Sequence, residues 1–312
     1  MIEYIETANE SAWLLLRSQN VNSTESAALF GLSPYQTELE LFHRKRNAEV
    51  QSIADNFRMR AGRYLEGSIA QLAANELDCT VKPYKVYARD ADARMGSSFD
   101  YEILTGDYAG WLMEIKNVDR LVYREAWQDN EAPAHIEVQC QHQLEMTERP
   151  GIIIAALVGG NELKFIERKR NEKMGAGIRQ RIQRFWSDVE ANNEPFRLAN
   201  FERDAEFIIS LHQSAGDAVY VADETDNVSM LLHDYHRLKR EASDLDALAK
   251  AKKAEILDAV GDEFKKIVTA GLTVTCGMTK DTPPTLITED MVGQTYGGRK
   301  GYRMFTLREK KA

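Results

Sequence analysis

The sequence predicts an α/β protein, and three features in the middle of the chain support this prediction. Residues 97–104 and 110–118 flank the turn sequence Thr105-Gly106-Asp107-Tyr108-Ala109, a pattern typical of a β-hairpin. The continuous apolar run from Ile152 to Val158 suits a buried strand. A helical segment over 133–148 separates the hairpin from this strand, and elements that alternate in this way favour an α/β fold.

The N-terminal segment is expected to be helical. Thr7 or Asn9 is placed to cap a first helix, and the hydroxyls of Ser23-Thr24-Glu25-Ser26 are placed to cap a second, which Gly31 ends. Further helices are expected over 37–47, 58–75 and 176–192, and further strands over 80–89 and 162–167.

The C-terminal third differs from the rest of the chain in its sequence pattern. We place a first domain at residues 1–215 and a second at 216–312. The second domain contains a long, charged segment, 228–270, whose apolar residues follow a 4-3-4-3 rhythm, as in a helical hairpin or a short coiled coil. The tail over 272–307 is rich in Gly and Thr and has strand-like pieces. We interpret this domain as an oligomer or partner contact.

The composition is that of a globular protein. The chain has 312 residues, of which 43% are hydrophobic and 29% are charged, enough to build a sizeable core in about two domains. No segment approaches the ~20 apolar residues of a membrane span. The first residues, Met1-Ile2-Glu3-Tyr4, lack the basic region and apolar core of a signal peptide. We therefore expect neither a membrane protein, nor a small secreted domain, nor a fibrous protein.

The cysteines and the net charge further limit the kinds of protein that this chain can be. Cys79, Cys140 and Cys276 lie far apart and form no C-x-x-C pair, so we expect neither a zinc ribbon nor a disulfide framework. A reducing, cytoplasmic compartment is the default interpretation. The net charge of −9 argues mildly against nucleic-acid binding, but a carboxylate-rich metal site and a basic groove can lie on different surfaces of one protein.

Side chains that carry chemistry gather on the predicted hairpin. Asp100 lies on its first strand and Glu114-Ile115-Lys116 on its second. Because strand side chains alternate, Glu114 and Lys116 share a face. A hairpin closed near residues 105–110 sets Asp100 opposite about residue 115, and a shift of one residue brings it onto the face of Glu114 and Lys116. The sequence leaves this register open.

If the shift holds, two carboxylates and an ammonium converge. Carboxylates and a strand carbonyl are the hard-oxygen ligands that Mg²⁺ prefers. A bound metal lowers the pKa of water and stabilises charge on a phosphate, and a Lys beside it can orient or deprotonate that water. The pattern Glu-x-Lys alone is weak, because it occurs five times in the chain and lone carboxylates are more often solvated. Only Glu114 lies on an apolar strand with an Asp on a plausible partner strand.

These residues resemble a known family. Asp100 and Glu114-Ile115-Lys116 resemble the core motif of the PD-(D/E)xK nucleases, and the flanking motifs, over roughly residues 8–200, resemble those of the YqaJ-like viral recombinases, relatives of the lambda exonuclease. The flanking motifs are Trp13-Leu14-Leu15-Leu16-Arg17, Ser23-Thr24-Glu25-Ser26-Ala27-Ala28, Gly31-Leu32-Ser33-Pro34-Tyr35, Gly62-Arg63-Tyr64-Leu65-Glu66, Val138-Gln139-Cys140-Gln141-His142-Gln143-Leu144, and Phe185-Trp186 with Val189 and Pro195. The chain departs from the pattern at Phe99, where the nominal motif has Pro, at Thr24, where Ser is commoner, and at Ile136, where an aromatic is frequent.

The resemblance implies a restriction-endonuclease-like core, a mixed central sheet flanked by helices, to which we add a C-terminal helical hairpin and a small β-rich tail. It implies a metal-dependent 5′-to-3′ exonuclease on linear double-stranded DNA that leaves 3′ single-stranded overhangs for phage-type recombination by strand annealing. The implied assembly is a homotrimer around DNA, and the implied partner is a single-strand annealing protein. The setting would be the cytoplasm of a bacterial host, with the chain encoded by a phage or prophage.

The resemblance also implies a role for each residue. Asp100, Glu114 and the Ile115 carbonyl would hold Mg²⁺, with Mn²⁺ as a substitute, and Glu66 would hold a second metal directly or through water. Lys116 would position the nucleophilic water, and Gln139 would orient that water or contact the scissile phosphate. Arg17 and Thr24 would bind the terminal 5′-phosphate. A guanidinium suits phosphate, and Thr24 lies at a predicted helix start, which offers N–H groups to an anion.

Two alternatives stay open. One is another enzyme with the same core, such as an endonuclease or a Cas4-like nuclease, although iron–sulfur members need four cysteines and this chain has three. The other is a non-catalytic DNA-binding scaffold for recombination, against which the intact Asp100, Glu114 and Lys116 speak.

Overall fold

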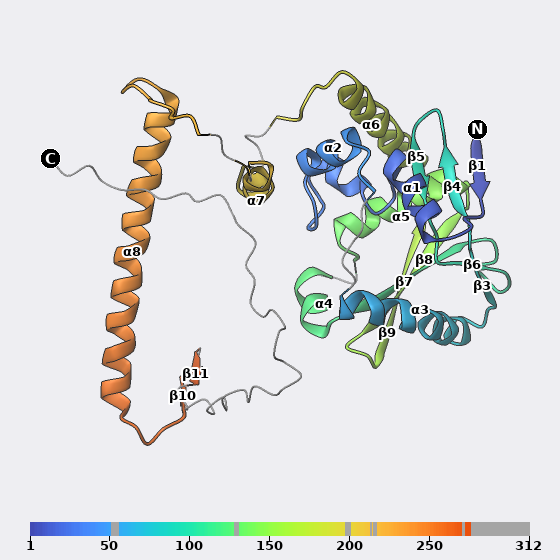
Figure 1. The fold of residues 1–312 in the computed structure, drawn as a ribbon. Coiled ribbons are helices and arrows are strands. Elements are labelled where there is room, and N and C mark those ends of the chain that lie inside the picture. Colours follow the sequence, from blue (N-terminus) through green and yellow to red (C-terminus); the bar gives the residue numbers. More distant parts are fainter. Residues whose placement is uncertain are drawn as a thin grey trace, which may run out of the picture. The chain divides into compact units, whose positions relative to one another are not determined.

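The larger part of the chain folds around two β-sheets (Figure 1). The computed structural model describes residues 1–50, 56–127, 131–196, 201–212, 214, 217–269 and 272–275. The chain divides into two compact units, Met1–Ile209 and Ser210–Ala312. The first unit contains a mixed sheet with helices on both faces, which confirms the predicted α/β class with a mixed central sheet flanked by helices.

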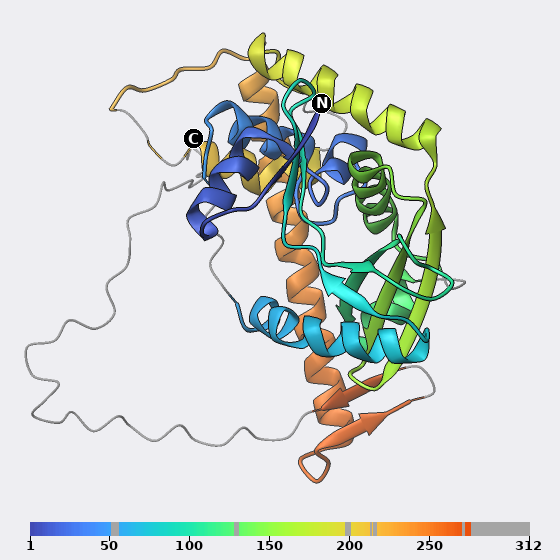
Figure 2. The ribbon, with the colours of Figure 1, turned by 90° about the vertical axis from the view of Figure 1, so that its right-hand side faces the viewer.

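The central sheet has five strands, and its topology is mixed. Strands β7 and β8 are parallel, and the other neighbours are antiparallel. Figure 2 shows β8 and β9 as long yellow-green strands of this sheet. The order is β3 (Val81–Pro83), β6 (Tyr101–Ile103), β7 (Leu112–Val118), β8 (Gly151–Val158) and β9 (Glu162–Lys169).

Helices pack on both faces of this sheet. On one face, α3 (Phe57–Glu76) belongs to an apolar cluster with Ile153 of β8. On the other face, α5 (Ala134–Thr147) belongs to a cluster with Ile152. All eight residues of β8 are buried, because both of its faces are covered. This explains the continuous apolar run in the sequence, which predicted the strand correctly.

A second, four-stranded sheet lies in the same unit. It is antiparallel except for the pairing of β2 with β5. Its order is β1 (Ile2–Ile5), β4 (Tyr87–Asp90), β5 (Met95–Ser97) and β2 (Val21–Asn22). Helix α6 (Glu172–Glu190) buries Phe185 and Trp186 in the main core, and α4 (Arg120–Ala126) follows β7 directly.

Several predicted helix boundaries are confirmed. Helix α1 (Glu10–Gln19) is capped by Asn9, whose side chain accepts a hydrogen bond from the Ala12 N–H at 2.9 Å. Helix α2 (Glu38–Arg46) is capped in the same way by Thr37. The predicted helices over 58–75, 133–148 and 176–192 correspond to α3, α5 and α6 within a few residues.

The predicted helix start at 23–26 is partly wrong. The segment forms only a short 3-10 helix, η1 (Ser26–Phe30), and its N-cap residue, Glu25, makes no side-chain cap. Gly31 does end the element, in the left-handed conformation at φ 67°. The Glu25 carboxylate accepts instead from the Asn22 N–H, and this contact fixes the turn before η1.

Two strand predictions also need correction. The single strand expected over 80–89 is two strands, β3 and β4, in different sheets, because the Val86 N–H donates to the Tyr84 carbonyl at 2.9 Å in a tight turn between them. The first hairpin strand, expected over 97–104, is divided in the same way: Ser97 belongs to β5 and Tyr101–Ile103 to β6.

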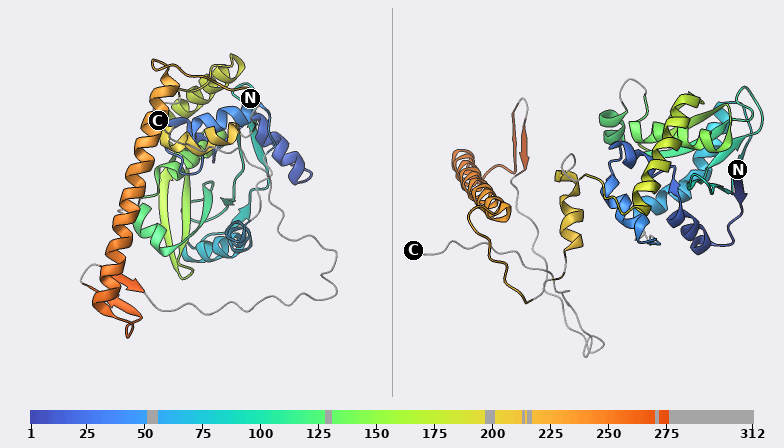
Figure 3. Two further views of the ribbon diagram at one scale, coloured as in Figure 1. Left: turned by 60° about the vertical axis from the view of Figure 1, so that its left-hand side comes forward. Right: turned by 90° about the horizontal axis from the view of Figure 1, so that it is seen from above.

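The helical hairpin expected in the C-terminal unit is wrong. Helix α8 (Asn227–Val260) is one unbroken helix, as Figure 3 shows, because its sequence contains neither Gly nor Pro before Gly261 ends it. The remaining elements are α7 (Phe201–Leu211), β10 (Lys266–Val268) and β11 (Thr273–Thr275), and β10 pairs with β11 in antiparallel fashion. Most of the predicted β-rich tail, with Cys276, lies outside the described residues. Among the described helices, none is long and apolar enough to cross a membrane.

Candidate active site

The register of the β6–β7 hairpin decides where Asp100 lies. Tyr101 pairs with Met113 and Glu102 with Leu112. Continued by one residue, this register sets Asp100 opposite Glu114, which is the one-residue shift that the sequence left open. The Asp100 Oδ2 accepts a hydrogen bond from the Ile115 N–H at 2.8 Å, so the carboxylate is anchored to the neighbouring strand.

Glu114 lies at the centre of the site and is only 3% exposed. Its Oε1 accepts from the Lys116 Nζ at 2.6 Å and from the Gln139 Nε2 at 2.5 Å. Its Oε2 accepts from the Gln143 Nε2 at 2.8 Å. Strand β7 thus supplies Glu114 and Lys116, and α5 supplies two side-chain amides that donate hydrogen bonds to Glu114. Gln139 and Gln143 point the same way because they are four residues apart on one helix.

A single pocket of about 360 Å³ contains these groups. Every residue for which the sequence suggested a site role lines it, including Glu66, which α3 contributes from the other face of the sheet. The predicted residues that line it are Arg17, Thr24, Glu66, Asp100, Glu114, Ile115, Lys116 and Gln139.

The electrostatics of the pocket are dominated by its carboxylates. Burial and the neighbouring Glu114 raise the pKa of Asp100 well above its ordinary value, and Lys116 opposes this only in part. Burial and Glu114 also raise the pKa of Glu66. Burial by itself lowers the pKa of Lys116, but Glu114 and Asp100 outweigh it and raise that pKa. Lys116 therefore stays protonated, which suits it to orient a water rather than to deprotonate one.

The donor set suits a hard divalent cation. Three carboxylates, those of Glu66, Asp100 and Glu114, face one ammonium, so the formal charge is 1 − 3 = −2. Carboxylate and carbonyl oxygens are the ligands that Mg²⁺ prefers. Within the described residues, no three His, Cys, Asp or Glu side chains form a ready-made metal cluster. The two oxygens of Glu114 accept three N–H groups, two on Oε1 and one on Oε2, and this leaves about one lone-pair site, on Oε2, for a cation.

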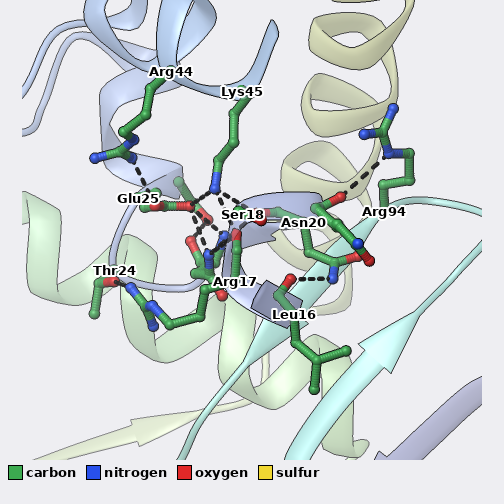
Figure 4. Close-up of polar contacts among 12 residues, drawn as sticks. Leu16, Arg17, Ser18, Asn20, Thr24, Glu25, Arg44, Lys45 and Arg94 are labelled. Atoms are coloured by element: carbon green, nitrogen blue, oxygen red, sulfur yellow. Dashed lines mark hydrogen bonds and ion pairs between the residues drawn. The ribbon is translucent and has the colours of Figure 1, made fainter. Parts of the chain in front are cut away.

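Arg17 and Thr24 form a second pair of polar side chains that line the same pocket. The Arg17 guanidinium donates to the Thr24 Oγ1 at 3.2 Å (Figure 4). It also lies 4.7 Å from the centre of the Trp13 ring, which holds it on one side. The helix start expected to assist Thr24 is absent, because η1 has only five residues and is a 3-10 helix. Anion binding here must depend on the side chains.

Part of the chain matches a known family. Residues 12–150 match the family described as the YqaJ-like viral recombinase domain. No curated protein matches the chain.

Solved structures similar to this chain include two of the same exonuclease. LHK-Exo in complex with dAMP is 18% identical, with a TM-score of 0.48, and covers 63% of this chain and 98% of its own. The alkaline exonuclease LHK-Exo from Laribacter hongkongensis is 19% identical, with the same TM-score and coverage. A phage-related exonuclease from Haemophilus somnus 129PT is 11% identical, with a TM-score of 0.40, and covers 55% of this chain and 96% of its own. Likenesses this distant assign neither a substrate nor an assembly.

The fold also places residues in the pocket to which the sequence gave no role. Gln143 is 1% exposed and bonds Glu114 directly, and its position four residues after Gln139 was the only sequence signal. The Trp13 Nε1 donates to the Ser98 Oγ at 2.9 Å, and both residues line the pocket. Ser98 gives no sequence signal, because it becomes part of the site only through the fold.

Proposed function

We propose that this protein is a metal-dependent 5′-to-3′ exonuclease that degrades linear double-stranded DNA and leaves 3′ single-stranded overhangs for recombination by strand annealing. The observation that carries the proposal is that two sets of side chains line the same pocket. The carboxylates around Lys116 suit phosphodiester hydrolysis, and Arg17 with Thr24 suits a phosphate. The YqaJ-like viral recombinase domain supports a role in DNA recombination.

The metal would be Mg²⁺, with Mn²⁺ as a substitute. Asp100, Glu114, the Ile115 carbonyl and Glu66 would hold it. When bound, such an ion lowers the pKa of a water and offsets charge on the phosphate. Burial and mutual repulsion oppose the simultaneous ionisation of the three carboxylates, and a divalent cation would favour it by offsetting the charge of −2 that they would then share with Lys116.

The remaining side chains orient the reacting groups. Gln139 and Gln143 hold the Glu114 carboxylate, so its position is fixed before any ligand binds. Lys116, charged and 2.6 Å from Glu114, has N–H groups that can orient the attacking water. Gln139 would orient that water or contact the scissile phosphate. Arg17 and Thr24 would bind the terminal 5′-phosphate and so set which bond reaches the carboxylates.

The assembly and setting form part of the same proposal. We propose a homotrimer around DNA and a single-strand annealing protein as a partner, in the cytoplasm of a bacterial host that carries the phage or prophage. Residues 1–215 would be the exonuclease core, and residues 216–312 would serve an oligomer or partner contact. These points rest on the family resemblance and not on contacts in the structure.

The deciding experiment uses linear duplex DNA labelled at one end, incubated with and without Mg²⁺. We expect the 5′ strand to shorten only with the metal, and Asp100→Asn and Lys116→Ala to abolish digestion while melting cooperatively. Cutting of closed circular plasmid would instead identify an endonuclease. DNA binding in a mobility-shift assay without metal-dependent digestion would identify a non-catalytic scaffold.

A further inference from the structure

A buried ionic cluster lies directly behind the Arg17–Thr24 pair (Figure 4). Its members are Glu25, Arg44 and Lys45, whose side chains are 8%, 11% and 2% exposed. Burying charged groups is costly unless each is paired and hydrogen-bonded. Such a cluster beside a candidate anion site therefore invites a functional explanation.

Lys45 ties the backbone around Arg17 together. Its Nζ donates to the Arg17 carbonyl at 2.8 Å and to the Asn20 carbonyl at 2.7 Å. It also lies 2.8 Å from the Glu25 Oε2. An ammonium has three N–H groups, so these three contacts use all of them. One side chain from α2 thus links the end of α1, the start of β2 and the residue after Thr24.

The Glu25 carboxylate anchors the segment that carries Thr24 to Asn22 and to Arg44. Its Oε2 accepts from the Asn22 N–H at 2.9 Å and from the Asn22 Nδ2 at 2.8 Å, and its Oε1 accepts from Arg44 at 2.7 Å. The Asn22 Nδ2 in turn donates to the Arg17 carbonyl at 3.0 Å. The backbones of Arg17 and Thr24 are therefore fixed relative to each other by groups that do not line the pocket themselves.

Three cations act on the Glu25 carboxylate: Arg44 at 2.7 Å, Lys45 at 2.8 Å, and Arg17 through its charge. Burial would raise the pKa of Glu25, but Lys45, Arg44 and Arg17 together lower it to about 2. A terminal phosphate monoester carries about −1.5 to −2 charges at neutral pH, whereas an internal phosphodiester carries one. Charge-assisted hydrogen bonds from a positioned Arg17 guanidinium should therefore be stronger to the monoester.

We propose that Lys45 and Glu25, with Arg44 as a partner of Glu25, are positioning residues that fix Arg17 and Thr24 for a phosphate monoester and so favour this group over an internal phosphodiester. The inference rests on the proposed function and adds a basis for end specificity. Neither Lys45 nor Glu25 touches the DNA. They act through the backbone that carries Arg17 and Thr24.

The test compares digestion of two linear duplexes that differ only in a 5′-phosphate or a 5′-hydroxyl end. The readout is the ratio of the two rates at subsaturating DNA. The variants are Lys45→Met/Glu25→Gln, which removes both buried charges at once, and Arg44→Met, which leaves the backbone contacts of Lys45 in place. Arg46→Met is the matched control, because Arg46 lies on the same helix, is exposed and bonds Asn192 instead.

We expect the wild type to prefer the 5′-phosphate end. The double variant should lower the ratio about tenfold, and Arg44→Met severalfold, with the rate on 5′-hydroxyl ends unchanged within about twofold. The control should keep the wild-type ratio. A purely structural role would lower both rates together, with a lower melting temperature and no change in the ratio.

The outcomes separate this inference from the proposed function. If the wild type digests no linear duplex, the proposed function fails. If it digests both duplexes equally, the exonuclease stands and the inference is overturned. A preference that survives in both Arg44→Met and the double variant also overturns the inference. Should the double variant not melt cooperatively, Arg44→Met decides the question alone.

Discussion

Gln143 offers a sharp test of how α5 supports the site, because stability and activity should respond differently to its loss. Its Nε2 donates to the Glu114 Oε2 at 2.8 Å, while its buried Oε1 has no hydrogen-bond partner among the described residues. A hydrogen bond to a charged group contributes about 1.5–3 kcal/mol, and an unpaired buried oxygen costs about 1–3 kcal/mol. Gln143→Leu removes both, so the free energy of unfolding should change by less than about 2 kcal/mol.

Activity should fall much further in the same variant. Without Gln143, the Glu114 Oε2 loses its amide partner, and the carboxylate can rotate away from the position that faces Asp100. A misplaced catalytic group costs roughly 10²-fold in rate. The assay pairs urea unfolding with single-turnover digestion of linear duplex, and Gln71→Leu, on the exposed surface of α3, is the control. A large loss of stability with unchanged digestion would refute the argument.

Three further predictions follow from named contacts. Removal of divalent metal with a chelator should abolish digestion but retain DNA binding, as measured by fluorescence anisotropy, because the proposed phosphate contacts of Arg17 and Thr24 need no metal. The stability contributed by His142 and Glu25 should be lost as pH drops, because their folded pKa values are depressed: that of buried His142 from 6.5 to about 3, and that of Glu25 from 4.5 to about 2. The unfolded chain then binds more protons, so urea midpoints should decline from about pH 6.5 downward, and His142→Gln should flatten the upper part of this decline. Gly96→Ala should destabilise by about 1–3 kcal/mol in thermal unfolding, because its Cβ would meet the hydroxyl of Tyr87, which bonds Asn22.

The sequence could predict the parts of the site that depend on local pattern. Glu114 and Lys116 share a face by strand alternation alone, and the apolar run of β8 follows from burial on both faces. The pairing of Asp100 could be predicted only to within one residue, because the turn alone does not fix the register. The pairs Tyr101–Met113 and Glu102–Leu112 fix it in the folded sheet.

Other parts depend on contacts between distant segments, which local pattern does not contain. Lys45 reaches carbonyls that lie 25 and 28 residues earlier in the chain, so nothing near it in sequence indicates its partners. The hydroxyl-rich segment 23–26 does not cap an α-helix, because Glu25 pairs with the distant Lys45 and accepts from the Asn22 N–H. The 4-3-4-3 rhythm over 228–270 does not distinguish a helical hairpin from one long helix, and the chain forms the long helix.

The repeated Glu-x-Lys pattern shows that environment, rather than motif, makes a site. On β9, Lys164 lies 2.7 Å from Glu162, a distance close to that of the Lys116–Glu114 pair. Both β9 side chains are more than a third exposed, and Arg120 competes for the same carboxylate, so this pair is a screened surface contact. Glu114 differs because α5 covers it, and its side chain is only 4% exposed. The same two residue types therefore have different chemistry on the two strands, and the helix that brings Gln139 and Gln143 is the cause.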